Sequence, residues 1–411
     1  MRLASRALAV VALCCVPAVA LGSQARAAFA DRSIATSAAT AESAFSLALL
    51  NELGGSGNVV YSPYSIDIAL TMADAGAGGQ TASQIAGVLQ ARSAGAAVAD
   101  TAALRTSLGS AVGSGAGAPT LDIANALWTQ SGLALQAPFV ATLSGGFAAP
   151  PQSTDFAGAP AAALKAINAW VSSHTNALIP TLLGPGSITP ATAFVLANAI
   201  YLKAHWQDPF LRSRTRPASF TTPSGQVVQV PFMNQLDGNY PYGAATDYQA
   251  VDLPYSSNSL SLLAILPRGV TLAHFEHDLT APALAGISRR LQVQGVDLSM
   301  PKLDLSSQES LNAPLEQLGM TDAFSSAADF RGVTTQRSLY ISLIEHAAVL
   351  KIDEQGTVAA GATAVVAPTL AVPVSRRPVS MVLNRPYLLL LRDDNSGAIL
   401  FVASVANPSQ G

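Results

Sequence analysis

Residues 351–371 read KIDEQGTVAAGATAVVAPTLA, and this stretch decides how the rest of the chain is interpreted. It begins with an acidic segment, and between positions 356 and 366 it contains only glycine, alanine, threonine and valine. Such small residues suit a surface loop, and they equally suit a strand that enters between close neighbours. Because side chains alternate along a strand, one face would carry Thr357, Ala359, Gly361, Thr363, Val365 and Ala367. We therefore expect a loop that is able to insert into a β-sheet as a new strand.

The composition indicates a single large folded domain. Of the 411 residues, 50% are hydrophobic and 11% are charged, so the chain is able to bury a sizeable core. No linker-like run and no repeat period divides it, which favours one domain over two or three. The net charge of -3 comes without a basic patch, so nucleic acid is not an expected partner.

The start of the chain reads as an export signal. Two arginines precede an apolar run at 7–21, and small residues follow it. We expect cleavage after Ala20 or after Ala27, and we assign 1–27 to the signal and 28–411 to the mature domain. The apolar run is too short for a comfortable membrane span, and no later segment is long and apolar enough. A membrane is therefore not an expected partner.

Both cysteines, Cys14 and Cys15, fall within this signal. The mature chain is therefore expected to have no disulfide, no thiolate nucleophile and no ligand for a soft metal. We expect secretion to the extracellular space or the periplasm. The frequent use of Ala, Gly and Arg with few Lys is typical of a bacterium with GC-rich genes.

Hydrophobic periodicity and turn residues predict the main secondary-structure elements. Helices are expected at 38–53, 63–75 and 161–178, and strands at 58–61, 121–129 and 194–201. Residues 93–119 are weakly patterned and predict at most a short helix and a loop. Near the C-terminus, a turn at 393–397 joins two apolar strands. The strand at 194–201 contains one polar side chain, Asn198, whose amide needs partners because an unpaired buried amide costs roughly 1–3 kcal/mol.

The motifs of common enzymes are absent. The sequence has no Gly-x-Ser-x-Gly elbow, and its one Ser-x-x-Lys match, at 299–302, contains Pro301, which does not suit the helix that this motif needs. The five histidines include no His-Glu-x-x-His, and His274 with His277 is typical of a solvated helix face rather than a metal site. We expect no enzymatic activity, no metal and no cofactor.

Several segments, in order along the chain, resemble the serpin family. The pattern at 354–363 resembles the serpin hinge, apart from Val358, where an acidic residue is usual. Residues 58–81, NVVYSPYSIDIALTMADAGAGGQT, and 194–210, FVLANAIYLKAHWQDPF, resemble two further serpin signatures, the second apart from Ala204, where glycine is usual. Further matches lie at 230–233, 251–255, 262–267, 311–333 and 381–408. The chain is identified from these segments as a member of the family.

This resemblance implies an α+β fold in one domain, with three β-sheets, about eight or nine helices and a mobile reactive-centre loop at about 354–377. It implies hydrogen bonding between Asn198 and His346, and an ion pair between Lys302 and Glu354. It also assigns four groups of residues: a hinge (Glu354, Gly356, Thr357, Ala359, Ala360, Gly361, Ala362 and Thr363), a shutter beneath the central sheet (Ser62, Ser65, Asn198 and His346), a breach at its top (Trp206 and Lys302) and a reactive bond (Leu370–Ala371).

The activity that the resemblance implies is inhibition of a serine protease by a suicide mechanism. The target cleaves the loop, forms an acyl-enzyme, and is trapped covalently when the loop inserts into the central sheet. Leu370 before the cleaved bond suits chymotrypsin-like or elastase-like targets, whereas cleavage after Arg376 or Arg377 would suit trypsin-like ones. We expect a monomer. The alternative is a serpin that does not inhibit and acts as a binding or carrier protein.

Overall fold

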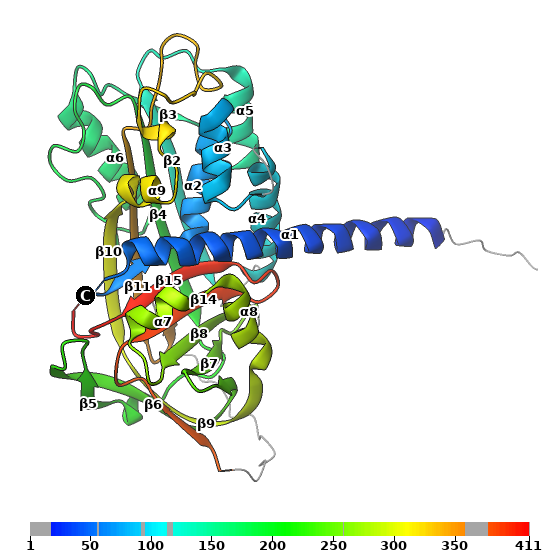
Figure 1. Ribbon diagram of the computed structural model, residues 1–411, viewed down its shortest axis with the longest axis vertical. Helices are drawn as coiled ribbons and strands as arrows, with labels where there is room; N and C mark the ends of the chain where they lie inside the picture. Colours follow the sequence, from blue (N-terminus) through cyan, green and yellow to red (C-terminus); the bar gives the residue numbers. More distant parts are fainter. Residues whose placement is uncertain are drawn as a thin grey trace, which may run out of the picture.

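The computed structural model describes residues 18–55, 57–91, 95–112, 118–257, 259–357 and 377–410 (Figure 1). The predicted reactive bond at Leu370 and Ala371, the hinge positions 359–363, Arg376 and both cysteines lie outside these ranges. Along the described residues, no helix is both long enough and apolar enough to cross a membrane.

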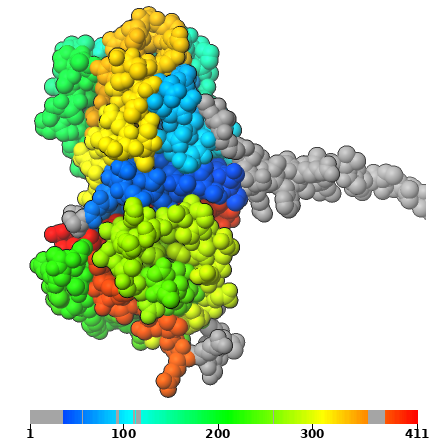
Figure 2. All heavy atoms as spheres, viewed as in Figure 1, coloured from blue at the N-terminus to red at the C-terminus, as the bar shows by residue number. Residues whose placement is uncertain are grey.

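Nine α-helices lie within the described residues: α1 (Ala18–Leu53), α2 (Pro63–Asp74), α3 (Gly79–Val88), α4 (Ala96–Val112), α5 (Ala137–Gly146), α6 (Pro160–His174), α7 (Leu272–Asp278), α8 (Ala281–Arg290) and α9 (Asn312–Gln317). Two short 3₁₀ turns, η1 (Arg212–Arg214) and η2 (Asp322–Phe324), complete the helical elements. The C-terminal half of α1 crosses the body, with α7 and α8 on one side and the region around α9 on the other (Figure 2).

The central sheet has six strands in the order β10 (Leu303–Ser310), β11 (Leu343–Asp353), β12 (Gly356–Thr357), β4 (Phe194–His205), β2 (Thr120–Gln130) and β3 (Gln152–Thr154). Strands β11 and β4 also pair with each other directly and in parallel, from Leu343 opposite Val195 to Ala348 opposite Ile200. Beyond that point β12 lies between them.

The remaining strands form a continuous nine-stranded array. Its order is β1 (Val59–Tyr61), β15 (Ile399–Val405), β14 (Tyr387–Asp393), β8 (Leu260–Pro267), β7 (Tyr248–Pro254), β6 (Val227–Ala244), β9 (Gln292–Pro301) and β13 (Val379–Val382), with β5 (Arg216–Thr221) on β6. The ladder between β6 and β9 shifts register between Gln235 and Gly238, so one half of β6 pairs with β5 and the other with β7. The expected α+β architecture with three sheets is confirmed, with two of the sheets joined through β6.

The two faces of the central sheet enter different cores. Even-numbered residues of β11 and β4, such as Ile344 and Leu196, belong to the main core, which includes α2. Odd-numbered residues, such as Val195, pack with Ile167 and Val171 of α6. This alternation fixes the side on which any strand inserted between β11 and β4 places its side chains.

Three helix boundaries differ from the prediction. Helix α1 begins at Ala18, 20 residues before the expected start, and continues across both proposed cleavage positions. The region predicted to hold at most a short helix contains α4, with 17 residues. Helix α6 ends at His174 instead of residue 178, because Asn176 and Ala177 adopt positive φ angles that no α-helix continues through.

Candidate functional site

The predicted hinge enters the central sheet at Gly356. Gly356 and Thr357 form β12, and Thr357 lies opposite Ile352 of β11 on one side and Ala204 of β4 on the other. Its side chain is only 1% exposed. Two residues of the predicted hinge, Gly356 and Thr357, therefore already occupy strand positions between β11 and β4.

Gly356 is the residue that permits this close approach. Its φ of +149° lies in a region that side-chain-bearing residues rarely adopt. A Cβ atom here would overlap the carbonyl oxygen of Ala204 and lie 2.9 Å from Cα of His205. The conformation and the space both require glycine at this position.

Trp206 holds the chain that leads into β12. Its indole Nε1 donates to the carbonyl of Asp353 at 2.9 Å, and its backbone N–H donates to the carbonyl of Gln355 at 2.9 Å. The ring stacks on Tyr255 with centroids 4.5 Å apart and planes 13° apart. The Tyr255 hydroxyl in turn hydrogen-bonds the Thr357 hydroxyl. This aromatic pair therefore anchors both the turn before β12 and β12 itself.

Glu354 ties the same turn to the neighbouring strands. Its carboxylate accepts hydrogen bonds from Lys302 at 3.0 Å and from the Thr215 hydroxyl at 2.7 Å, so the predicted pair of Lys302 and Glu354 is present. Burial raises the pKa of Glu354, but the hydrogen bonds from Thr215, Lys302 and its own backbone N–H, together with the Lys302 charge, hold the pKa below its ordinary value. Its side chain is 5% exposed, so loss of Lys302 would leave a buried carboxylate without its cation.

The four predicted shutter residues meet beneath the sheet. The backbone N–H of Ser62 donates to Nε2 of His346 at 3.0 Å, so Nε2 is the acceptor and Nδ1 carries the proton. That Nδ1–H donates to the amide oxygen of Asn198. The Asn198 amide nitrogen donates to the carbonyl and hydroxyl oxygens of Ser65, both at 2.6 Å, and to the amide oxygen of Asn125. These bonds connect α2, β11, β4 and β2.

Asn125 is the shutter residue that sequence reasoning missed. It lies on β2 directly opposite Asn198 of β4. Both asparagines stand between two alanines in an apolar strand, at 124–126 and at 197–199. A second lone asparagine in a buried strand was the available signal, because each needs polar partners and one satisfies the other. Tyr255 and Thr215 were also missed: Tyr255 ends the 251–255 segment that resembles the family, but its contact with Thr357 was not predicted, and nothing local in the sequence marks Thr215.

Strands β11 and β4 keep one register on both sides of the point where they part. His346 pairs directly with Asn198, and Ile352 faces Ala204 across Thr357, so the offset is 148 residues in both places (346 − 198 and 352 − 204). A strand lying between them continues both ladders without a register slip. Lengthening β12 therefore requires the two strands to move apart but not to slide.

We expect acid to weaken the shutter, because burial lowers the pKa of His346 to about 3. The unfolded state takes up this proton near pH 6.5 and the folded state does not, so stability falls as pH drops from about 6.5 toward 3. The loss is about 2 kcal/mol between pH 7 and pH 5. Burial raises the pKa of Asp67 to about 6 and of Glu276 to about 7, and these carboxyls act in the opposite direction.

Urea unfolding of wild type and His346→Gln at both pH values isolates the contribution of the histidine to stability. If the difference in unfolding free energy between wild type and His346→Gln were the same at pH 7 and pH 5, the expectation would be wrong.

We expect Asn198→Ala to shorten the lifetime of the native state. The substitution leaves the His346 Nδ1–H without its partner, at about 1–3 kcal/mol, and leaves the Asn125 oxygen with only the Ser65 hydroxyl as donor. Faster spontaneous loop insertion or polymerisation on warming should follow, measured by native gels over time at a fixed temperature. Asn239→Ala, at an exposed position of β6, is the matched control. Equal lifetimes for Asn198→Ala and wild type would remove Asn198 from this role.

Comparison with known proteins gives consistent matches over most of the chain. The family model described as Serpin (serine protease inhibitor) matches residues 40–408. An uncharacterized serpin-like protein of Thermococcus kodakarensis is 34% identical over 374 residues, which cover 89% of this chain and 85% of that protein. Leukocyte elastase inhibitor of Bos taurus is 33% identical over 370 residues, covering 87% and 95%. The structure of human thyroxine-binding globulin complexed with its ligand superposes with a TM-score of 0.80 at 28% identity, covering 91% of this chain and 99% of that chain.

The family model spans the central sheet, the shutter and the breach, and the relatives cover most of their own lengths as well as of this one. The chain therefore belongs to the serpin family.

Proposed function

We propose that this serpin inhibits serine proteases as a suicide substrate. The position of β12 is the observation that carries the proposal. Thr357 already lies between β11 and β4, and these two strands keep the same register where they pair directly and where β12 separates them. The target's serine attacks the carbonyl carbon of Leu370, the bond to the nitrogen of Ala371 breaks, and the departing amine takes a proton. An ester then joins the loop to the protease, and insertion of the loop precedes hydrolysis of that ester.

The ladders of β12 predict the order in which insertion proceeds. Extended residue by residue, they place Val358 opposite Lys351 and Lys203, and Thr363 opposite His346 and Asn198. The hydrogen bond between His346 and Asn198 must therefore break when Thr363 enters the sheet. Loop residues of Gly, Ala, Thr and Val meet no steric barrier of the kind that large or charged side chains create.

The proposed targets are chymotrypsin-like or elastase-like proteases, with Leu370–Ala371 as the reactive bond. The similarity to leukocyte elastase inhibitor supports an apolar specificity pocket in the target. We further propose that residues 1–27 are an export signal, that the protein acts as a secreted monomer, extracellular or periplasmic, of bacterial origin, and that it has no enzymatic activity of its own.

The test is incubation of the purified protein with chymotrypsin, elastase and trypsin, followed by denaturing gels. Inhibition by this mechanism gives a covalent complex of the protease with the loop-cleaved inhibitor, stable to boiling in detergent. Thermal unfolding before and after loop nicking supplies an independent readout, because an inserted strand should raise the midpoint markedly. Cleavage by all three enzymes without any covalent complex would contradict the proposal.

A binding or carrier function is the second candidate. The similarity to thyroxine-binding globulin, a binding protein by name, favours it. A serpin of this kind that keeps its loop out of the sheet should show the same unfolding midpoint before and after nicking. The nicking experiment therefore distinguishes the two functions without knowledge of the physiological target.

A further inference from the structure

A cavity of about 520 Å³ lies next to the shutter, among α2, α4, α6, β2 and the segment that joins α5 to β3. Its apolar walls include Ile123, Phe147 and Trp170. Strand β3 pairs with β2 from Trp128 to Gln130. The cavity lies beside the earlier part of β2, which β3 does not cover. Its volume is in the range of small-molecule sites.

The wall of this cavity contains a buried donor without an acceptor. Asn125 lines the cavity and is 8% exposed, and its Nδ2 has no hydrogen-bond partner within the described chain. Its orientation is fixed from the other end of the shutter: the Ser62 N–H makes His346 donate to Asn198, and Asn198 donates to the Asn125 oxygen. The unpaired group is therefore an N–H donor and requires an acceptor.

The charge of the residues that line the cavity indicates which kind of ligand group would accept a hydrogen bond from Asn125. Arg105 of α4 lines the cavity, and none of the described residues that line it is acidic. The Arg105 guanidinium donates to the Gly146 carbonyl and retains further N–H groups. Trp170 stacks on His174 with ring centroids 4.2 Å apart, which provides a flat aromatic wall. A ligand that fits has an apolar, preferably aromatic, body and a negatively charged oxygen group.

We propose that this cavity binds a small organic carboxylate, with the carboxylate accepting from Arg105 and Asn125 and the apolar body lying against Trp170. Resting on the inhibitory function above, the site is a regulatory one. It is lined by α2 and α4 on one side and β2 on the other, and β2 is paired to β4, which must part from β11 during insertion. The ligand completes the hydrogen-bond chain that ends at Asn125, so it binds the closed sheet preferentially and slows insertion.

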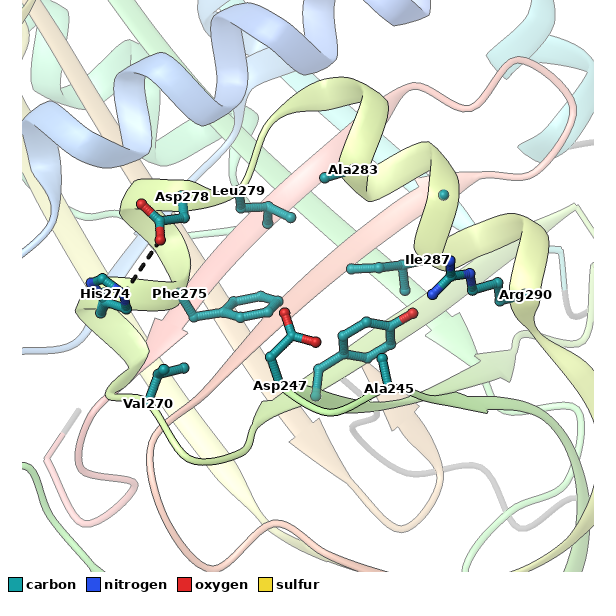
Figure 3. Close-up of a pocket in the computed structure, with 12 residues that line it drawn as sticks. Ala245, Asp247, Val270, His274, Phe275, Asp278, Leu279, Ala283, Ile287 and Arg290 are labelled. Carbon is teal, nitrogen blue, oxygen red and sulfur yellow. Dashed lines mark ion pairs between the residues drawn. The ribbon is translucent and has the colours of Figure 1, made fainter.

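A second cavity provides a control of opposite charge (Figure 3). It has a volume of about 350 Å³ and lies between α7, α8 and the turn from β6 to β7. Arg290 lines it, but so do the carboxylates of Asp247 and Asp278, the latter paired with His274 at 3.3 Å. Figure 3 shows the Asp247 carboxylate directed into the cavity beside Phe275. An organic anion is therefore disfavoured here, although an arginine is present.

Calorimetric titration of the full chain tests the binding, with naphthalene-1-acetate as the anionic probe and naphthalene-1-acetamide as its neutral analogue. We expect saturable binding of the anion with a Kd on the order of 1 mM or tighter, and about tenfold weaker binding of the amide. Arg105→Met should weaken binding of the anion about tenfold, whereas Arg290→Met should leave it within about twofold. Asn125→Asp should also weaken binding of the anion, because it replaces the N–H donor with a carboxylate that repels the ligand.

Binding that survives Arg105→Met, or that Arg290→Met removes, would overturn the assignment, as would the absence of saturable binding. The regulatory part is measured separately, as the rate of the nicking-induced rise in unfolding midpoint with and without saturating naphthalene-1-acetate. A slower rise with bound ligand would support the regulatory role, and an unchanged rate with bound ligand would contradict it. Because titration does not depend on protease trapping, failure of the inhibitory function and failure of this site give different results.

Discussion

Replacement of Thr357 by arginine is expected to convert the proposed inhibitor into a substrate. Thr357 is 1% exposed, and its hydroxyl bonds Tyr255 between β11 and β4, so neither space nor a carboxylate awaits a guanidinium there. An unpaired buried charge costs about 3–5 kcal/mol, enough to slow insertion by at least about 100-fold if the cost falls on the inserting step. Hydrolysis of the acyl-enzyme then outruns insertion. Only the two residues of β12 need to leave the sheet, so we expect the fold itself to remain.

The measurement is the number of inhibitor molecules consumed for each protease molecule trapped. We expect this number to rise about tenfold or more for Thr357→Arg, with cleaved inhibitor in place of covalent complex on denaturing gels. Gln355→Arg is the matched control, because it adds the same cation two residues earlier at a partly exposed position. If Thr357→Arg trapped protease with undiminished yield, Thr357 would not enter the sheet and the register of β12 would be wrong.

The shutter and breach pairs could be predicted because motif resemblance carries long-range contacts that local patterns do not contain. The bond between His346 and Asn198 joins residues 148 positions apart, and no periodicity indicates it. Asn125 was missed although it pairs with Asn198, because its partner became apparent only when β2 lay against β4. Thr215 and Tyr255 were missed for the same reason. Their contacts depend on the sheet register and not on their own neighbours in sequence.

Helix α4 was underestimated because its own sequence is rich in small residues and contains glycine. Its alanines favour a helix, but Gly109 and the β-branched residues do not, and so few large apolar residues occur that no clear helical periodicity marks it; packing then stabilises the helix. Its buried residues Leu104 and Leu108 belong to the main core, and Thr101 donates to Asp67 of α2. The sequence likewise allows the hinge to be either loop or strand. That β12 already lies in the sheet depends on Gly356 and on the space beside Ala204.

Leu370→Arg is expected to redirect the inhibitor from chymotrypsin-like to trypsin-like proteases. A trypsin-like pocket contains a buried carboxylate, which leucine leaves unpaired and arginine satisfies with charge-assisted hydrogen bonds. Such a pairing is worth about 2–5 kcal/mol, so we expect trapping of trypsin to accelerate by about 100-fold and trapping of chymotrypsin to fall comparably. Rate constants for both enzymes with wild type and variant provide the measurement. Little change in either rate would show that Leu370 does not enter the specificity pocket.

The rival is cleavage after Arg376 or Arg377, and the length of the tether decides between the two. Counted from the ladders of β12, Val366 would reach Leu343 and Val195, near the far ends of both strands, which leaves only four residues to Leu370. Cleavage after Arg376 would add six more residues, or about 20 Å of extended chain. That slack would leave the protease free to complete hydrolysis, because insertion would no longer pull it tightly against the end of the sheet. Mass spectrometry of the released peptide distinguishes the sites: a new N-terminus at Ala371 supports the tight register, and one at Arg377 or Pro378 overturns it. An Arg376→Ala, Arg377→Ala double variant should trap chymotrypsin as wild type does.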